Sequence, residues 1–124
     1  MSITLNGTTG VTTPSLVPSG SSIPANGVYL PGANTVGIAT NGVNAVTVDS
    51  SGNLGLGVTP SVWQTTSYKV LEFPYGVSIF GQTDASSLIC ATNAYINSSY
   101  VWTYKTSAQA SYYRQYQGQH SWYT

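Results

Sequence analysis

The chain has 124 residues, three basic and three acidic side chains, and a formal net charge of zero. Only 5% of its residues are charged, compared with about 25% in an ordinary soluble domain. This leaves no cluster of Lys and Arg for nucleic-acid phosphates, and no apolar run reaches the length of about 18 residues that a membrane helix needs.

Residues 1–22 are predicted to form an extended N-terminal arm. The segment Ser2–Leu5 alternates polar and apolar residues, as a short strand does, and Pro14 and Pro18 exclude a helix from the Ser/Thr/Gly-rich stretch that follows. One interpretation is a flexible terminus. The other is an arm that becomes ordered by docking on a neighbouring chain or a larger particle. The apolar residues expected to dock are Ile3, Leu5, Val11 and Leu16.

Residues 23–62 are predicted to form a β-turn-β module. Asn41-Gly42 is the strongest short hairpin signal in the chain. In the turn over residues 49–52, Asp49 can accept hydrogen bonds from the backbone that follows it. The expected strands are Val28–Leu30, Asn34–Thr40 and Val43–Val48.

The next segment, Asn53–Val58, alternates strictly between larger apolar residues and glycine. In a strand it would place Leu54, Leu56 and Val58 on one face, and Gly55 and Gly57 on the other. A bare glycine face lets another backbone approach closely. Two interpretations stay open, a contact between chains and a tight turn within one chain.

Residues 63–124 are predicted to form an aromatic-rich β region. Seven of the ten Tyr residues follow position 90. Cys90 lies in a segment that looks like a buried strand, so we expect a small core residue there. A turn or one short helical turn is expected over residues 106–110, and no helix longer than two turns is expected anywhere. The expected strands are Tyr68–Phe73, Val77–Phe80, Leu88–Tyr95 and Tyr100–Lys105.

Five aromatic residues of this region are candidate contacts for a glycan or for a subunit interface. Aromatic faces stack on sugar rings, but aromatic residues on strands more commonly pack a β core or an interface. We favour packing, because these rings are the largest apolar surface that the chain has. The candidates are Tyr100, Trp102, Tyr104, Trp122 and Tyr123.

The sequence predicts no catalytic residues, no metal site and no cofactor. His120 is the only histidine, and the three acids that could orient it are distant in sequence. One histidine and one cysteine cannot build a zinc site within a chain. Glu72 and Lys69 lie three apart in a predicted strand, so they face opposite sides and form no simple pair.

The segment Gly27–Pro60 resembles a segment common in bacteriophage tail fibres and related virion fibre proteins. The likeness lies in Gly27-Val-Tyr-Leu-Pro-Gly-Ala-Asn-Thr-Val-Gly-Ile-Ala-Thr-Asn-Gly42 and in Val46-Thr-Val-Asp-Ser-Ser-Gly-Asn-Leu-Gly-Leu-Gly-Val-Thr-Pro60. The opening of the chain and Tyr113–Tyr123 also look like segments of such proteins. Where that group often has a Glu/Arg-rich stretch, this chain has Val43-Asn44-Ala45.

The resemblance implies a trimeric fibre, attachment through the N-terminal region to other virion proteins of the tail or capsid, and host recognition at the distal end. Composition and patterning predict an all-β fold, an extended or fibrous module in an intertwined homotrimer. We therefore expect a non-enzymatic virion protein, assembled in the host bacterial cytoplasm, that contributes to attachment and host adsorption as a tail fibre or fibre base. The alternatives are a head fibre or capsid decoration protein, and a carbohydrate-binding receptor-recognition module.

Overall fold

The computed structural model describes residues 20–124, so the arm residues Ile3, Leu5, Val11 and Leu16 lie outside the described residues. The described part is all-β, as expected, and its one helical element is a short 3-10 turn, Pro74–Gly76. The strands are β1 Gly27–Gly32, β2 Thr35–Thr40, β3 Val43–Val48, β4 Leu54–Leu56, β5 Tyr68–Glu72, β6 Ser78–Gln82, β7 Ser87–Thr92, β8 Ala94–Ile96, β9 Trp102–Tyr104, β10 Ser111–Tyr116 and β11 Gln119–Tyr123.

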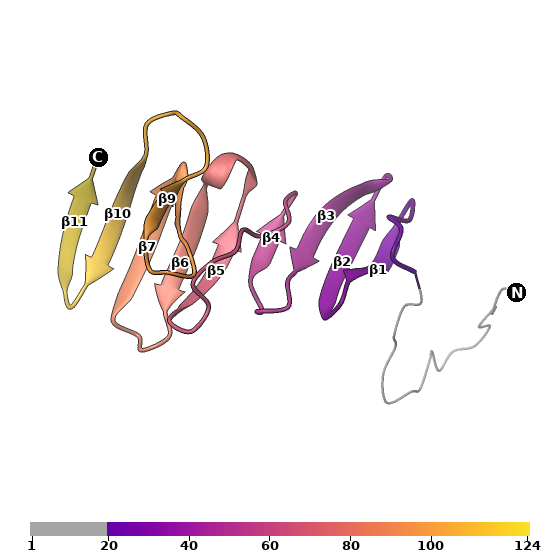
Figure 1. The fold of residues 1–124 in the computed structure, drawn as a ribbon, viewed down its shortest axis with the longest axis horizontal. Helices are drawn as coiled ribbons and strands as arrows, with labels where there is room; N and C mark the ends of the chain where they lie inside the picture. The colour runs from indigo at the N-terminus through magenta and orange to yellow at the C-terminus, as the bar shows by residue number, and fades with distance from the viewer. Residues whose placement is uncertain (1–19) are drawn as a thin grey trace, which may run out of the picture.

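Nine strands form one mixed sheet in the order β1-β2-β3-β4-β5-β6-β7-β10-β11. All neighbours are antiparallel except β4 and β5, which are parallel. The remaining strands, β8 and β9, pair with each other as a separate two-stranded sheet. Because the spatial order follows the chain order, the backbone advances along the long axis of the molecule, with β1 at one end and β11 at the other (Figure 1).

The β-turn-β prediction is confirmed for the first three strands. Asn41 and Gly42 join β2 to β3 with φ values of 50° and 70°. This positive pair is what a tight two-residue hairpin with the twist of its strands requires. Asp49 is the predicted turn residue, since its Oδ1 accepts from the backbone N–H groups of Ser51 at 2.9 Å and Asn53 at 2.8 Å.

The glycine alternation at β4 forms a tight turn within the chain. Gly55 is buried, and a Cβ there would collide with the carbonyl oxygen of Val58 and lie 3.0 Å from Pro60 Cδ. Of the two interpretations left open by the sequence, close approach by the chain's own following loop is therefore confirmed for Gly55. Gly57 is exposed and has φ +67°, which an L side chain rarely adopts.

The prediction of one strand over Leu88–Tyr95 is wrong, because the chain leaves the sheet at Asn93. This residue has φ +56°, and its Oδ1 accepts from Thr106 N and Thr106 Oγ1, each at 2.9 Å. Its Nδ2 donates to Ala108 O at 2.7 Å. The Asn93 side chain thus links the end of β7 to residues 106 and 108, where the chain returns from β9 toward β10.

Two further predictions in this region are wrong. Tyr100 is not in a strand, because it has φ +61° and lies in the turn before β9. Cys90 is exposed, because strand alternation places its neighbours Ile89 and Ala91 in the core and Cys90 on the other face of β7.

The hydrophobic core lies on one face of the sheet only. Trp63 and the β8–β9 hairpin lie over that face, where Trp63 meets Phe80 of β6 with ring centroids 4.9 Å apart. The hairpin crosses in front of the sheet near β6 and β7 (Figure 1). The buried cluster is Trp63, Val70, Phe80, Ile89, Ala91 and Ile96.

Candidate functional site

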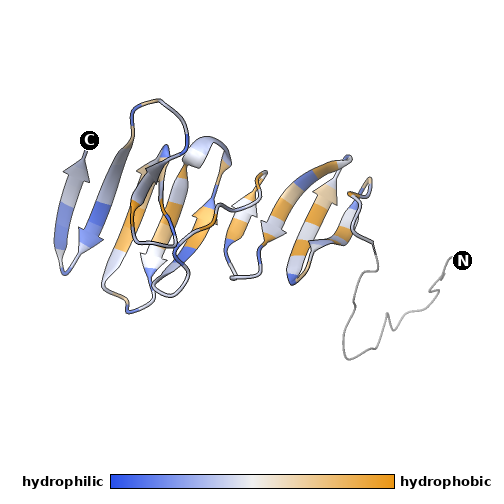
Figure 2. Cartoon of the chain, viewed as in Figure 1, coloured by the Kyte–Doolittle hydropathy of each residue, from blue (hydrophilic) through white to orange (hydrophobic). Residues whose placement is uncertain are grey.

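The opposite face of the sheet, here called the open face, carries a continuous row of apolar side chains. Residues that pair directly across neighbouring strands project to the same side. The strand register links eight strands, β2 to β7 with β10 and β11, in one line. Apolar residues recur along β2 to β7 (Figure 2). The row consists of Val36, Val48, Leu54, Leu71, Ile79, Cys90, Tyr113 and Trp122.

A second row runs beside the first in the N-terminal half, and the two rows together are here called the apolar band. Many of these side chains are well exposed, among them Val48 at 38%, Ile79 at 41% and Trp122 at 80%. Near β6 and β7 the band forms a shallow hollow that also includes Phe73 and Val77. The second row consists of Val28, Ile38, Val46 and Leu56.

The neighbouring register positions point to the covered face and are mostly small or polar. From β1 to β7 every residue in this line is buried. The usual pattern of a sheet with one wet face places apolar residues inside and polar residues outside. Here Thr, Ser, Gly and Glu take much of this buried line, whereas Val, Leu and Ile take the open one. The next line of the covered face holds the core residues Val70, Phe80 and Ile89, so apolar residues occur on both faces. The buried line consists of Tyr29, Gly37, Thr47, Gly55, Glu72, Ser78 and Ala91.

Charged groups are nearly absent from the open face. Lys69 is exposed there, two residues before Leu71 on the same face of β5, and its ammonium donates to the Ser51 carbonyl oxygen. The register continues from Lys69 through Gly81, Leu88 and Gln115 to His120. The apolar band is therefore bordered in the C-terminal half by a line that is partly polar.

A buried carboxylate anchors the covering segment to the sheet. Glu72 is fully buried at the end of β5, and its Oε2 accepts from Ser61 N at 2.8 Å and from Trp63 Nε1 at 2.6 Å. Its Oε1 accepts from Ser61 Oγ at 3.0 Å and lies 2.6 Å from Lys105 Nζ. As expected, Lys69 on the opposite side of β5 takes no part in this cluster.

The electrostatics of this cluster favour the charged form of Glu72. Burial disfavours a carboxylate and by itself raises the pKa of Glu72. The hydrogen bonds from Lys105, Trp63 and Ser61, together with the Lys105 charge, outweigh burial and bring the pKa below its ordinary value. These contacts are all internal, so the cluster acts as a structural anchor.

Three aromatic rings form a stacked ladder on the covered side at the C-terminal end. Trp102 stacks on Tyr112 with centroids 4.4 Å apart, and Tyr112 stacks on Tyr123 at 4.3 Å, with interplanar angles of 16° and 15°. Burial raises the pKa of the Tyr112 phenol. Because Tyr112 is stacked on both sides, its ring has no free face on which a sugar could stack.

The five aromatic residues singled out from the sequence do not come together as one site. Trp102 and Tyr123 belong to the ladder, while Trp122 lies on the open face next to Tyr113, with centroids 4.6 Å apart. Tyr100 lies in a turn and its hydroxyl is 3.1 Å from Ser67 Oγ. Tyr104 is 66% exposed.

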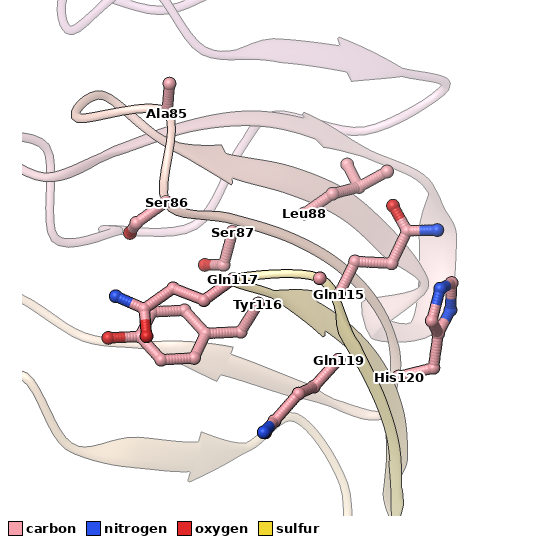
Figure 3. A pocket seen from close by; sticks show the side chains of 10 residues that line it. Ala85, Ser86, Ser87, Leu88, Gln115, Tyr116, Gln117, Gln119 and His120 are labelled. Atoms are coloured by element: carbon pink, nitrogen blue, oxygen red, sulfur yellow. The ribbon is translucent and has the colours of Figure 1, made fainter.

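His120 lies at the edge of a shallow hollow formed by the β6–β7 turn and the β10–β11 hairpin. Its side chain lies on the same side as those of Leu88 and Gln115 (Figure 3). Its Nδ1 shares a hydrogen bond with the hydroxyl of Tyr113. None of the described residues that line this hollow is a carboxylate that could orient the imidazole as a base.

Within residues 20–124, no three His, Cys, Asp or Glu side chains gather as a metal site would require. No helix of this part of the chain has the length and apolar character needed to cross a bilayer. Comparison of the chain with protein-family models, with curated proteins and with solved structures gave no match.

Proposed function

We propose that this chain is a non-enzymatic structural component of a bacteriophage virion, a tail fibre or fibre base that works as a homotrimer and contributes to particle attachment and host adsorption. The proposal is supported by the course of the backbone along the sheet. Strands follow each other in space almost as they do in sequence, so the chain enters at one end of an elongated sheet and leaves at the other (Figure 1). A fibre segment needs such a linear course, because it transmits a connection from one end to the other.

The resemblance of Gly27–Pro60 to virion fibre segments adds the phage context. In the structure these residues form the first four strands and the turns between them. The segment therefore corresponds to the N-terminal part of the nine-stranded sheet. The proposed location is the virion, with other tail or capsid proteins as partners.

The experiment that tests this proposal is gold labelling of purified parent particles with an antibody against the chain, viewed by electron microscopy. We expect label on the tail. Label on the capsid would favour the alternative of a head fibre or decoration protein. Particles that carry no label on either structure, although the antibody recognises the folded chain, would refute a virion role.

A carbohydrate-binding role has one observation in its favour, which is the 80% exposure of Trp122. A free indole face can stack on a sugar ring. A glycan array probed with the parent and with Trp122→Ala tests this candidate. A signal that disappears in the variant would support it, while an array without signal for the parent would remove it.

A further inference from the structure

We propose that the apolar band of the open face is buried against other copies of this chain, and that the band is the surface through which the protein self-associates. This inference deepens the proposed function by naming the surface and the partner, and it rests on the homotrimeric part of that proposal.

Apolar side chains on both faces show that the sheet needs a second cover. The chain covers one face with Trp63 and the β8–β9 hairpin, where Val70, Phe80 and Ile89 contribute to the core. Further Val, Leu and Ile residues project from the opposite face, which nothing in the described chain covers. A contiguous apolar surface of this kind marks an interaction site in a soluble protein.

The size of the band is that of a specific interface. Strands lie about 4.8 Å apart and same-face residues about 6.8 Å apart along a strand, so a first row over eight strands and a second row over four cover about 390 Å² on one copy. Three copies together bring about 1,200 Å² into contact, the lower end of the range of specific protein interfaces.

A second copy fits this surface better than a different partner would. The band is straight and as long as the sheet, and only an equally long apolar surface covers all of it. Another copy of the chain supplies that length by construction. It also brings no repulsion to the band, because the charged neighbour Lys69 lies outside the two rows and is bonded to Ser51.

The width of the band is consistent with three copies around an axis that runs across the strands. Two sheets packed flat against each other at about 10 Å would bury the whole face, including the Lys69 line. Three sheets around an axis bury the central rows and leave the bordering line near solvent. The axis then coincides with the direction in which the backbone advances (Figure 1).

The test compares two substitutions of the same chemistry at exposed valines. Val48→Lys places a charge in the band, whereas Val62→Lys places it on the loop before Trp63, where Val62 is 76% exposed and off the open face. Sedimentation should give the parent and Val62→Lys about three times the chain mass of 13.1 kDa. Val48→Lys should sediment as the single chain, because an unpaired ammonium is not accommodated in an apolar contact.

Cys90 is a built-in reporter, because it is the only cysteine and lies in the band. A thiol reagent should react slowly with the parent and with Val62→Lys. With Val48→Lys it should react more than about tenfold faster, because Cys90 is exposed in the single chain. Circular dichroism then separates dissociation from unfolding, since a folded single chain keeps the β signal of the parent.

A parent that sediments as a single chain with a fast-reacting Cys90 overturns this inference, as does a Val48→Lys variant that keeps the parent's mass. A dimer that dissociates only in Val48→Lys supports the band as the surface and refutes the trimer of the proposed function. Binding of a single-chain parent to phosphatidylcholine vesicles would assign the band to a lipid surface and overturn the inference. The gold-labelling result is independent of all these outcomes.

Discussion

Replacement of Glu72 by Gln should destabilise the fold strongly although it changes no shape. Removing one partner of a buried ion pair costs about 3–5 kcal/mol. Lys105 is 23% exposed and can regain water, and a glutamine oxygen can still accept from Ser61 N and Trp63 Nε1. We therefore expect Glu72→Gln to lower the free energy of unfolding by about 2 kcal/mol, which corresponds to a decrease in Tm of about 8 °C for a chain of this size.

The same variant should change the pH dependence of stability. The folded pKa of Glu72 lies below the ordinary value of 4.5, so the carboxylate contributes its full stabilisation above that value. The contribution is lost as the pH falls through the folded pKa. Thermal unfolding of the parent, followed by circular dichroism at fixed protein concentration, should therefore show Tm decreasing below about pH 4.5. Glu72→Gln should have a flatter profile.

The matched control is Asp84→Asn, which removes one of the other two acids outside the Glu72 cluster. Asp84 is exposed and accepts from Ser86 N at 2.9 Å, a bond that an asparagine oxygen can also accept. This variant should keep the Tm of the parent above about pH 4.5, because Asp84 is exposed. The hydrogen bonds of Ser86 lower the pKa of Asp84, so any difference in the acid profile should be confined to pH values below the ordinary value of 3.8. A Glu72→Gln protein with the parent's Tm and the parent's acid slope would refute the reasoning that this carboxylate anchors the covering segment.

Three further predictions concern single contacts and are measured by urea unfolding. Gly55→Ala should lower the free energy of unfolding by about 2 kcal/mol, because the new Cβ collides with the Val58 carbonyl. Gly81→Ala should lower it little, because its Cβ would meet Ser87 O at 3.6 Å, an ordinary contact distance. Equal losses of stability in the two variants would contradict this argument. Asn93→Ala should lower the free energy of unfolding more than Asn93→Gly. Both variants lose the hydrogen bonds of the side-chain amide, but glycine adopts the positive φ of this position without strain. Tyr112→Leu should cost about 1 kcal/mol beyond the lost area through its two stacks, and an unchanged midpoint would show that the ladder contributes nothing.

Most strands could be predicted from the sequence because their signals are local. Asn41-Gly42 fixes a hairpin through the φ values of two residues, and Asp49 closes its own turn. Neither depends on the rest of the chain. Cys90 shows where local reasoning fails, because an apolar run such as Leu88–Ala91 does not tell which alternate residues face the core. That choice is made by the side on which Trp63 and the β8–β9 hairpin cover the sheet, which is a matter of tertiary structure.

The features of the candidate site depend on contacts that no local pattern encodes. Glu72, at the end of β5, pairs with Lys105, which follows β9. Because 32 residues separate the two in the sequence, no local pattern indicates this pair. The one signal that could have indicated it was the position of Glu72 between the apolar pair Val70-Leu71 and Phe73. The apolar band required the register of eight strands, including a parallel pair, which the sequence does not specify.

The low charge of the chain and the apolar character of the open face are consistent with each other. Glu72 and Lys105 form the buried anchor, Asp49 and Asp84 hold turns, and Arg114 lies over the Tyr116 ring at 4.2 Å. Each of these groups has a role within the described fold, and only Lys69 is left to project beside the band. A sheet meant to stand alone in water would distribute charges over its open face to keep it soluble and separate. The sequence instead places valine, leucine and isoleucine there, and that choice stabilises the protein only when a matching surface covers them.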